Sequence, residues 1–558
     1  MREAGPVYSA CRARRLQLQY RSMVKATNSR RPLVFDQQRL RTAGLVVLLA
    51  VLALGFQGTR GIWSPDEGYH AVIARTMLES GEWLIPHVVN QVWLDKPPLS
   101  NWGMAAGMWL LGTNEWGARL SHALWYVLTT LLVFVLGRAL WDERSGRLAA
   151  ILYATMVLPF IAANVLTPDT PLTFWTTAAA VAFWFARARS GPEAEWWKVA
   201  LGVVLALGVW TKGPAALIPC AAMFVFLAAT GTLRSFFVSW GMVLGALGFL
   251  TIGLSWYAHV GAVVPGALEY VWDNHVAGRL VSASYERHPG LAGAVEVYLP
   301  VLLGGTLPAS AACWLALKRR WRGVLRRSFW QRLRHSPGDL LVVTWVVVPC
   351  LVLAAASSKL PLYVLPVFPT LALVCARLAS SEAEARGVPV SWLGLPARLS
   401  WPLAVWIAAL LALKAAGGVV DTNRDLRQLA AQLRNVVPPA PFEVVCIDLH
   451  CEGLVFYLGG AVERVLLASP PYPMFGGNEP LREELRELPE APYHHLLVYE
   501  AKTETALRRR MARYSWLCSE QPIALSHDRR AIVCRAAGEV AAAIAPETHQ
   551  LGRESPIP

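Results

Sequence analysis

The chain has 558 residues, of which 55% are hydrophobic and only 16% carry a charge. Soluble globular proteins carry about a quarter charged residues, so this composition excludes an ordinary soluble enzyme and favours a membrane protein. The formal net charge is +14, but the Arg and Lys residues gather in a few short segments between apolar runs. Such clustering follows membrane topology, and it argues against nucleic acid as a partner.

Apolar runs of roughly 17–25 residues recur along the chain, and a run of this length can cross a bilayer as one helix. A basic segment, residues 1–41, precedes the first run at 42–59, which we interpret as an uncleaved helix rather than a signal peptide. Further runs lie near residues 119–140, 148–165, 170–187, 198–211, 214–230, 235–257, 294–316, 340–356, 361–378 and 398–418. The sequence therefore predicts an α-helical polytopic membrane protein with about 11–13 transmembrane helices.

The charges of the connectors predict the orientation, because Arg and Lys mark the cytoplasmic side of a membrane. The connectors rich in these residues are 141–147, 187–198, 318–334 and the turn at Arg234. The opposite set comprises 59–118, 167–169, 212–213, 259–291 and 357–359, and it holds nearly all the motif-like residues. We expect a multi-pass membrane protein with a cytoplasmic N-terminus and these residues on the extracytoplasmic face.

The loop 59–118 is predicted to contain two short helices outside the membrane. The first begins at a cap, Ser64 or Asp66, runs to about Leu78 and stops at Gly81. Its apolar residues at helical spacing are Tyr69, Val72, Ile73 and Met77, so we expect it to lie along the membrane surface. The second helix, 99–111, follows the break at Pro97 and Pro98.

The composition changes near residue 418, and a small periplasmic α/β domain is predicted at 419–540, followed by an unstructured tail at 541–558. Short strands are expected at 442–449, 495–499 and 530–534, and helices at 482–488 and 504–514. The domain holds an even set of cysteines, Cys446, Cys451, Cys518 and Cys534. Disulfides persist outside the cytoplasm, but the spacing leaves all three pairings of four cysteines open.

Several ionisable residues of the outside connectors are candidates for chemistry. Asp66 and Glu67 open the first outside helix, where they serve either as a cap or as carboxylates that orient or deprotonate an acceptor. His70 lies one turn after Asp66 and can reach it on the same face, which makes it a candidate for substrate binding. Lys96 can neutralise a phosphate, with a snorkelling lysine as the alternative.

Asp169, Lys212 and Lys359 also lie at outside ends of predicted spans. No GxGxxG motif follows a strand and no GxxxxGK[ST] motif occurs, so no nucleotide cofactor is expected. Carboxylates, lysines, an arginine and a histidine from five separate connectors thus converge on one membrane face. A site for a phosphorylated, lipid-linked substrate needs this set of groups, because cations hold the phosphate and a carboxylate handles the acceptor.

The sequence resembles the GT-C membrane glycosyltransferases, and most closely the bacterial 4-amino-4-deoxy-L-arabinose lipid A transferases, relatives of protein O-mannosyltransferases. The resemblance covers roughly residues 60–370 and follows the family's order. The segments that carry it are PDEGYHAVIARTMLESGEWLIPHV, WLDKPPLSNW, NEWGARLSHAL, LTPDTPLTF, TKGP, WDNHVAGRL, ERHPG, YLPVLLGGTLP and SSKLPLYVLPVFP. It implies a GT-C-like fold and the inverting transfer of a sugar from a polyprenyl-phosphate donor to a lipid A-like or other extracytoplasmic acceptor. It also implies a location in the bacterial inner (plasma) membrane, with the active site and the C-terminal domain on the periplasmic face.

The resemblance also implies roles for individual residues. Asp66 becomes the leading catalytic carboxylate with Glu67 beside it, and Lys96 matches the lysine that binds the donor phosphate. The other implied substrate-binding residues are Asp169, Arg279, Lys359 and Tyr363.

A divalent metal, zinc, magnesium or manganese, is a further implication of the resemblance. The family holds it with a glutamate and a histidine, and the positions here are Asp95 and His275. Asp is one methylene shorter than Glu, and two protein ligands leave a metal site incomplete, so metal use stays open.

Two rival functions remain at this point. Within enzymes, the alternative is a protein O-mannosyltransferase-like activity with a protein acceptor. Outside enzymes, the alternative is a transporter or flippase for lipid-linked sugars, which would place polar groups near the bilayer midplane, often in inverted repeats. The ionisable groups here lie at span ends on one side, and no repeat is detectable, so a transferase in contact with membrane lipids is favoured.

Overall fold

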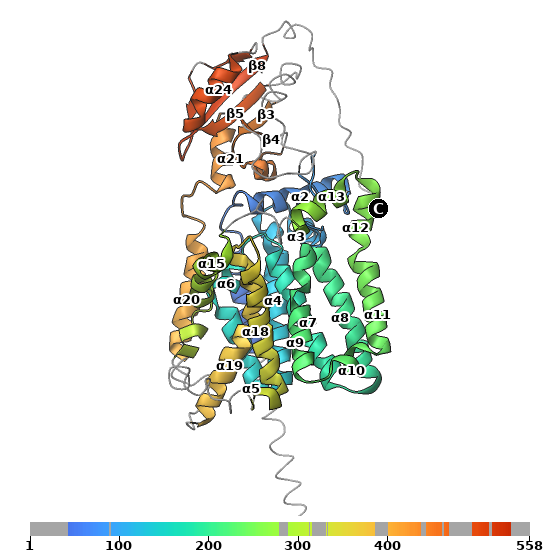
Figure 1. Cartoon of the computed structure of the whole chain (residues 1–558). Coiled ribbons are helices and arrows are strands. Elements are labelled where there is room, and N and C mark those ends of the chain that lie inside the picture. The colour runs from blue at the N-terminus through green and yellow to red at the C-terminus, as the bar shows by residue number, and fades with distance from the viewer. Residues whose placement is uncertain are drawn as a thin grey trace, which may run out of the picture.

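The computed structural model describes residues 43–88, 91–277, 288–311, 313–314, 331, 333–385, 400–436, 442–459, 462–467, 494–512, 516–519 and 521–536. These residues form a bundle of helices, and a small domain built around a β-sheet sits on one end of the bundle (Figure 1). We call this end the domain side. Two helices of the first long connector, α2 (Asp66–Ser80) and α3 (Leu99–Leu111), lie on the domain side.

The bundle confirms an α-helical polytopic membrane protein. Among the described residues, five helical stretches are long and apolar enough to cross a membrane: Glu115–Leu140, Gly191–Ala229, Trp240–Val263, Pro337–Ala355 and Pro361–Ser381. The stretch Gly191–Ala229 contains the change of direction at Gly213, where φ is +63°. Shorter apolar helices are Ala43–Leu54, Gly290–Gly305 and Trp401–Ala416.

The helices of the bundle follow the apolar pattern of the sequence closely. They are α4 (Glu115–Leu140), α5 (Glu143–Thr155), α6 (Val157–Ala162), α7 (Asp169–Ala188), α8 (Gly191–Lys212), α9 (Ile218–Ala229), α10 (Leu233–Phe237), α11 (Trp240–Gly248), α12 (Ser255–Val263), α13 (Ala267–Val271), α15 (Gly290–Gly305), α18 (Pro337–Ala355), α19 (Phe368–Ala385) and α20 (Ser400–Ala416). Short 3-10 turns, η1 (Gly213–Leu217) and η5 (Pro361–Val367), precede α9 and α19.

One predicted span, 148–165, is interrupted in the structure. α5 ends at Thr155, Met156 is extended with φ −67° and ψ 139°, and α6 begins at Val157. Pro159 explains the break, because a proline has no N–H to donate to the carbonyl four residues earlier. That carbonyl, of Thr155, instead accepts a hydrogen bond of 2.8 Å from the indole of Trp406. The prediction of one continuous helix was therefore wrong.

The C-terminal domain contains a sheet of six strands: β3 (Phe442–Ile447), β4 (Val462–Val465), β5 (His494–Glu500), β6 (Trp516–Cys518), β7 (Ile523–Ala524) and β8 (Arg529–Ala536). The order is β4-β3-β5-β8-β6, with β7 also paired to β8. β3 runs parallel to both of its neighbours, whereas β8 pairs antiparallel with β5, β6 and β7. All three predicted strands are confirmed, as is the helix α24 (Glu504–Met511); the predicted helix at 482–488 lies outside the described residues.

The structure selects one of the three disulfide pairings that the spacing left open. Cys446, in β3, is bonded to Cys451, and Cys518, in β6, is bonded to Cys534 of the neighbouring strand β8. The second pair is directly opposite in the antiparallel register. Both bonds lie within the C-terminal domain.

Helix α2 lies between the bundle and the C-terminal domain (Figure 1) and is buried on both sides. The predicted apolar face is confirmed, since Tyr69, Val72, Ile73 and Met77 pack with Val88. Its partners on this face are protein residues, and its position along the membrane surface stays a prediction. The helix begins after Pro65 without a side-chain cap, which also corrects the predicted cap at Ser64 or Asp66; it ends as expected at Gly81.

The opposite face of α2 belongs to a core shared with the C-terminal domain. Ala71 and Ala74 of α2 and Met104 of α3 lie in one apolar cluster with Leu429 of α21 (Leu426–Arg434) and Leu454 of η7 (Glu452–Leu454).

A close glycine contact permits this packing. A Cβ atom on Gly453 would lie 2.7 Å from the Cα of Gly68, closer than real Cβ contacts allow. The backbones of η7 and α2 therefore approach this closely because residue 453 lacks a side chain. The first outside helix and the C-terminal domain are thus one packed unit.

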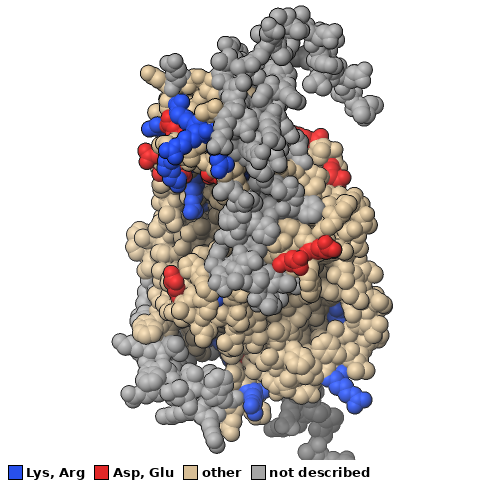
Figure 2. Space-filling view, turned by 45° about the horizontal axis from the view of Figure 1, so that its top comes forward, with Lys and Arg blue, Asp and Glu red and all other residues tan. Residues whose placement is uncertain are grey.

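Charged side chains are sparse on the visible surface of the bundle and gather at its two ends. Figure 2 shows Lys and Arg side chains clustered on the C-terminal domain and a few separate ones at the far end of the bundle. The connectors that the sequence predicts to be cytoplasmic and that the structure describes, such as the one between α9 and α10, lie at that far end (Figure 1).

Candidate active site

Glu67 is the centre of a buried ion network under α2. Only 3% of its side chain is exposed. Both carboxylate oxygens accept hydrogen bonds of 2.6 Å from the Arg60 guanidinium, and Arg119 of α4 lies 3.4 Å away. The backbone N–H groups of Trp63 and Leu166 also donate to this carboxylate, at 2.8 and 3.0 Å.

This network fixes the charge of Glu67. Burial alone would raise the pKa of its carboxyl, but Arg60, Arg119 and the hydrogen bonds together lower the pKa to about 2. Asn164 extends the network, because its side-chain oxygen lies 3.3 Å from Arg60 and its backbone oxygen 2.7 Å from the same guanidinium. Every lone pair of Glu67 is occupied, so the geometry suits a residue that holds α2 against α4 and the loop before α7.

Asp66, the preceding residue, has the opposite surroundings. Its side chain is exposed, and within the described residues it forms no hydrogen bond or ion pair. It stands in the first turn of α2, where the N–H groups of the helix favour an anion. A carboxylate held on a buried helix, with its lone pairs open, is a suitable acceptor for a hydrogen bond from a substrate.

His70 lies one helical turn after Asp66 and is buried. Its Nδ1 atom is 2.9 Å from the side-chain oxygen of Asn101, on α3. Burial lowers the pKa of His70, and Asp66, Lys96 and Asp169 all act electrostatically on the imidazole. The structure therefore brings Asp66 and Lys96, which are 30 residues apart in one predicted connector, close to His70 together with Asp169 of a second connector.

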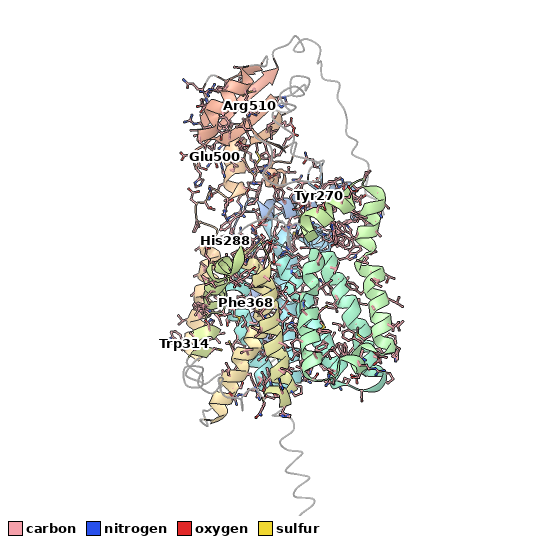
Figure 3. All side chains as sticks on the ribbon, viewed as in Figure 1. Tyr270, His288, Trp314, Phe368, Glu500 and Arg510 are labelled. Carbon is pink, nitrogen blue, oxygen red and sulfur yellow. A yellow bond between two sulfur atoms is a disulfide. The ribbon has the colours of Figure 1, made fainter. Side chains whose placement is uncertain are left out.

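Asp95 and Lys96 lie in the turn before α3. The Lys96 ammonium donates to the backbone oxygen of Asp95 at 2.7 Å, and the Asp95 carboxylate accepts a 2.8 Å hydrogen bond from Tyr270 of α13. Tyr270 is at the domain side of the bundle (Figure 3). The double proline that follows sets this turn, since α3 begins only at Leu99, after Pro98.

Asp169, at the first position of α7, is paired with Lys212 at the end of α8. Each of these two side chains is 7% exposed, and the Lys212 ammonium lies 4.6 Å from the ring centroid of Tyr363. The predicted residues Asp169 and Tyr363 therefore meet through Lys212, which the sequence showed only as a lysine on the unusual side of a span. The ion pair joins the domain-side ends of α7 and α8 to the turn η5.

Lys359 is fully buried, and its ammonium donates to the backbone oxygens of Ala356, at 2.7 Å, and His288, at 3.2 Å. His288 also lies at the domain side (Figure 3). No carboxylate of the described residues pairs with Lys359. Within the part of the chain that the structure describes, the positive charge of Lys359 is stabilised by two backbone carbonyl groups and not by a carboxylate. An anion that approaches this end of the bundle would therefore be attracted to Lys359.

The two remaining predicted residues are in the loop after α13. Arg279 lies outside the described residues, as does the side chain of His275. The described side chains include no group of three or more His, Cys, Asp or Glu residues that could hold a metal ion. Asp95, the other predicted metal ligand, bonds to Tyr270. The predicted pair of metal ligands therefore lies partly outside the described residues.

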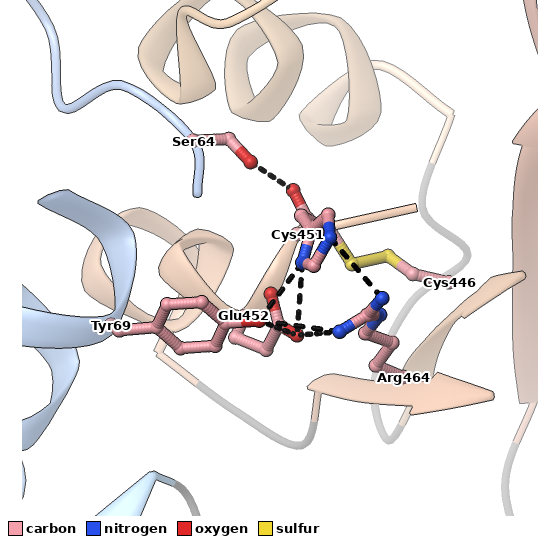
Figure 4. The surroundings of a disulfide bond; sticks show 7 residues. Ser64, Tyr69, Cys446, Cys451, Glu452 and Arg464 are labelled. Carbon is pink, nitrogen blue, oxygen red and sulfur yellow. Dashed lines mark hydrogen bonds and ion pairs between the residues drawn. A yellow bond between two sulfur atoms is a disulfide. The ribbon is translucent and has the colours of Figure 1, made fainter. Parts of the chain in front are cut away.

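The C-terminal domain contacts the start of α2 through a polar cluster (Figure 4). The Tyr69 hydroxyl donates to the Glu452 carboxylate at 3.0 Å and lies 2.9 Å from His450 Nδ1, while Arg464 lies 3.4 Å from Glu452. Burial raises the pKa of Glu452, although Arg464 opposes this shift. Ser64 also donates to the backbone oxygen of His450.

Several residues of this region were missed by sequence reasoning. Arg60, Arg119, Asn101 and Glu452 come from four segments whose proximity no local pattern reveals. Arg119 is the exception, because an arginine within an apolar helix requires a partner. In the structure this arginine is fully buried.

Comparisons with known proteins support the resemblance. Residues 95–257 match the family described as dolichyl-phosphate-mannose-protein mannosyltransferase. The chain is 32% identical over 342 residues to an undecaprenyl phosphate-alpha-4-amino-4-deoxy-L-arabinose arabinosyl transferase of Sodalis glossinidius, covering 61% of this chain and 59% of that protein. It is 32% identical over 322 residues to such a transferase of Pseudomonas fluorescens, and the alignment covers 57% of this chain and 55% of that protein. The chain thus spans less than two thirds of these relatives' length.

Solved structures with a similar fold cover more of the chain. ArnT from Cupriavidus metallidurans bound to undecaprenyl phosphate aligns with a TM-score of 0.69 at 19% identity, covering 91% of this chain and 99% of that one. The Archaeoglobus fulgidus oligosaccharyltransferase aligns with a TM-score of 0.50 at 12% identity, covering 84% and 71%. The chain therefore resembles the GT-C membrane glycosyltransferases and has their fold, as the sequence predicts.

Proposed function

We propose that the protein is a membrane glycosyltransferase that moves a sugar from a polyprenyl-phosphate donor to an acceptor at the domain side of the bundle. The observation that carries this proposal is the assembly of Asp66, His70, Lys96 and Asp169 at one end of the bundle. The arabinosyl transferases named above and the structure bound to undecaprenyl phosphate support the donor class. The acceptor is proposed to be a lipid A-like lipid.

The reaction is a direct displacement at the anomeric carbon with inversion. The acceptor oxygen attacks this carbon, and the bond to the phosphate oxygen breaks, so the electron pair leaves with the polyprenyl phosphate. Lys96 and Lys359 stabilise the departing phosphate, because preorganised cations at a partly dehydrated site lower the energy of developing negative charge. Asp66 orients the acceptor through its open lone pairs. Glu67 acts as a positioning residue that holds α2, and thereby Asp66, in place.

The orientation in the membrane is part of the proposal. We place the domain side in the periplasm, because the Arg-rich connectors lie at the far end of the bundle and mark the cytoplasm. The two disulfides of the C-terminal domain support this orientation, since such bonds persist outside the cytoplasm.

A second candidate is the transfer of a hexose to a protein hydroxyl. The match of residues 95–257 to the family described as protein mannosyltransferase favours it. It uses the same donor class and the same carboxylate, and it differs in the acceptor and in the sugar that the named relatives transfer.

The test is a transfer assay with the purified full chain in lipid nanodiscs. It combines undecaprenyl-phosphate pentoses and hexoses with lipid A or with a serine-rich peptide. Product on lipid A, with release of undecaprenyl phosphate, is the expected result. Product on the peptide alone would select the second candidate. No product with any donor, together with donor movement across a sealed vesicle membrane, would contradict a transferase.

A further inference from the structure

The tautomer of His70 is determined by its partner. The oxygen of the Asn101 carboxamide accepts a hydrogen bond, so Nδ1 of the neutral imidazole, 2.9 Å away, carries the proton. The other ring nitrogen, Nε2, then has an open lone pair. Nε2 forms no hydrogen bond with the described residues. It is also not completely shielded from solvent. A buried histidine with one nitrogen fixed and the other open can receive a proton.

The charged and titratable groups that act on His70 come from four segments of the chain. Asp66 is on the same helix, Lys96 precedes α3, His122 is on α4 and Asp169 opens α7. Asp169 is already neutralised by Lys212, which leaves Asp66 as the exposed carboxylate of the group. Burial lowers the pKa of His70, so the imidazole is neutral near pH 7 and able to accept a proton.

We propose that the acceptor group is a hydroxyl, that His70 takes its proton at Nε2, and that Asn101 is the positioning residue that fixes the tautomer. This inference rests on the proposed glycosyl transfer. As the acceptor O–H bond breaks, its proton moves to Nε2 and its oxygen bonds to the anomeric carbon. The bond from that carbon to the phosphate oxygen breaks at the same time, and the imidazolium later returns its proton to water.

The surroundings of Nε2 favour a hydroxyl over a phosphate acceptor. An ionised phosphate already presents a deprotonated oxygen, so it has no proton for Nε2 to receive. It would also meet the exposed negative charge of Asp66, one helical turn from His70. A hydroxyl can donate a hydrogen bond to Asp66 or to Nε2, so both acceptors favour its binding.

The test is the pH dependence of kcat/KM for the full chain in nanodiscs, with a hydroxyl acceptor. Wild type should lose activity as the pH falls through the pKa of His70, which lies below its usual range. Asn101→Asp places a carboxylate against Nδ1–H and stabilises the imidazolium, so this loss should move upward by about one to three pH units. His70→Gln should lower activity by about 100-fold or more and abolish the pH-dependent loss assigned to His70.

His527→Gln is the matched control, because His527 pairs with Asp421 of the C-terminal domain and with none of the proposed site residues, so the pH profile should not move. An unshifted profile in Asn101→Asp, or a wild-type profile in His70→Gln, would overturn the role of His70. Transfer to phosphate acceptors only would overturn the hydroxyl class. No turnover by wild type with any acceptor would instead indicate failure of the proposed transfer itself.

Discussion

The adjacent residues Asp66 and Glu67 belong to two regions of the site, which differ in how many of their polar groups form hydrogen bonds. The scaffold region comprises Glu67 with Arg60, Arg119 and Asn164, and its carboxylate is hydrogen-bonded on both oxygens. The reaction region comprises Asp66, His70 and Lys96, where the Asp66 carboxylate and His70 Nε2 are open within the described residues. The difference suggests that closed polar groups hold the helix, whereas open ones meet the substrate.

Asp66→Asn should produce the largest loss of activity. The amide keeps the size of the side chain but removes its charge, so transfer should fall by about 10²–10⁴-fold. The thermal unfolding midpoint should stay unchanged, because Asp66 makes no ion pair in the described structure. Transfer rate and unfolding midpoint are measured on the same preparation. A large drop in the midpoint would move Asp66 into the scaffold region.

Glu67→Gln should produce the largest loss of stability. Removing one member of a buried ion pair leaves Arg60 and Arg119 without their counter-charge, which costs about 3–5 kcal/mol. The matched control is Glu193→Gln, because Glu193 pairs with Arg189 at 3.4 Å on the surface, and loss of an exposed pair costs about 0–1 kcal/mol. Denaturant unfolding in detergent measures both. Equal effects of the two substitutions would contradict a buried scaffold.

The acid stability of the protein should depend on Glu67. Its carboxyl has a pKa of about 2 in the folded protein against an ordinary value of 4.5. A carboxyl whose pKa is lower in the folded than in the unfolded protein contributes its full stabilisation at pH values above the unfolded-state pKa. This stabilisation is lost as the pH falls from 4.5 towards 2. Glu67→Gln should therefore lose less stability than wild type over that interval in pH-dependent unfolding. Parallel curves for the two proteins would contradict the assigned ionisation.

Tyr69→Phe should have the smallest effect. It removes the hydroxyl that donates to Glu452 at 3.0 Å but keeps the ring that stacks on Trp93, with centroids 4.5 Å apart. Loss of this hydrogen bond should cost about 1 kcal/mol. Thermal unfolding together with limited proteolysis of the C-terminal domain measures the change. An unfolding midpoint equal to that of wild type would show that the polar cluster of Figure 4 adds nothing to the contact.

Much of the fold could be predicted from the sequence, because apolar run length and helix breakers are local signals. α3 was predicted at its observed bounds, and α2 stops at the expected glycine. The partner of α2 could not be predicted, since an apolar face at helical spacing packs equally well on lipid or on protein. The C-terminal domain supplies that partner through Leu429 and Leu454, more than 350 residues further along the chain.

The candidate site shows the same limit at the level of single residues. The sequence grouped Asp66 with Glu67 because they are adjacent, yet the first turn of a helix points adjacent side chains in different directions. Glu67 pairs with Arg119, 52 residues away, whereas Asp66 does not. Lys212 was noticed only as an unusual lysine, because its partner Asp169 lies at the end of a neighbouring helix. The identity of such partners depends on helix packing, which no local pattern encodes.

The most direct test follows a radiolabelled sugar on undecaprenyl phosphate after purified protein in nanodiscs is added. Wild type should move the label to an acceptor and release undecaprenyl phosphate, and Asp66→Asn should do neither while unfolding at the wild-type temperature. Equal transfer by Asp66→Asn and wild type would contradict the division into scaffold and reaction regions. A label that stays on undecaprenyl phosphate with wild type, for every donor and acceptor, would contradict glycosyl transfer.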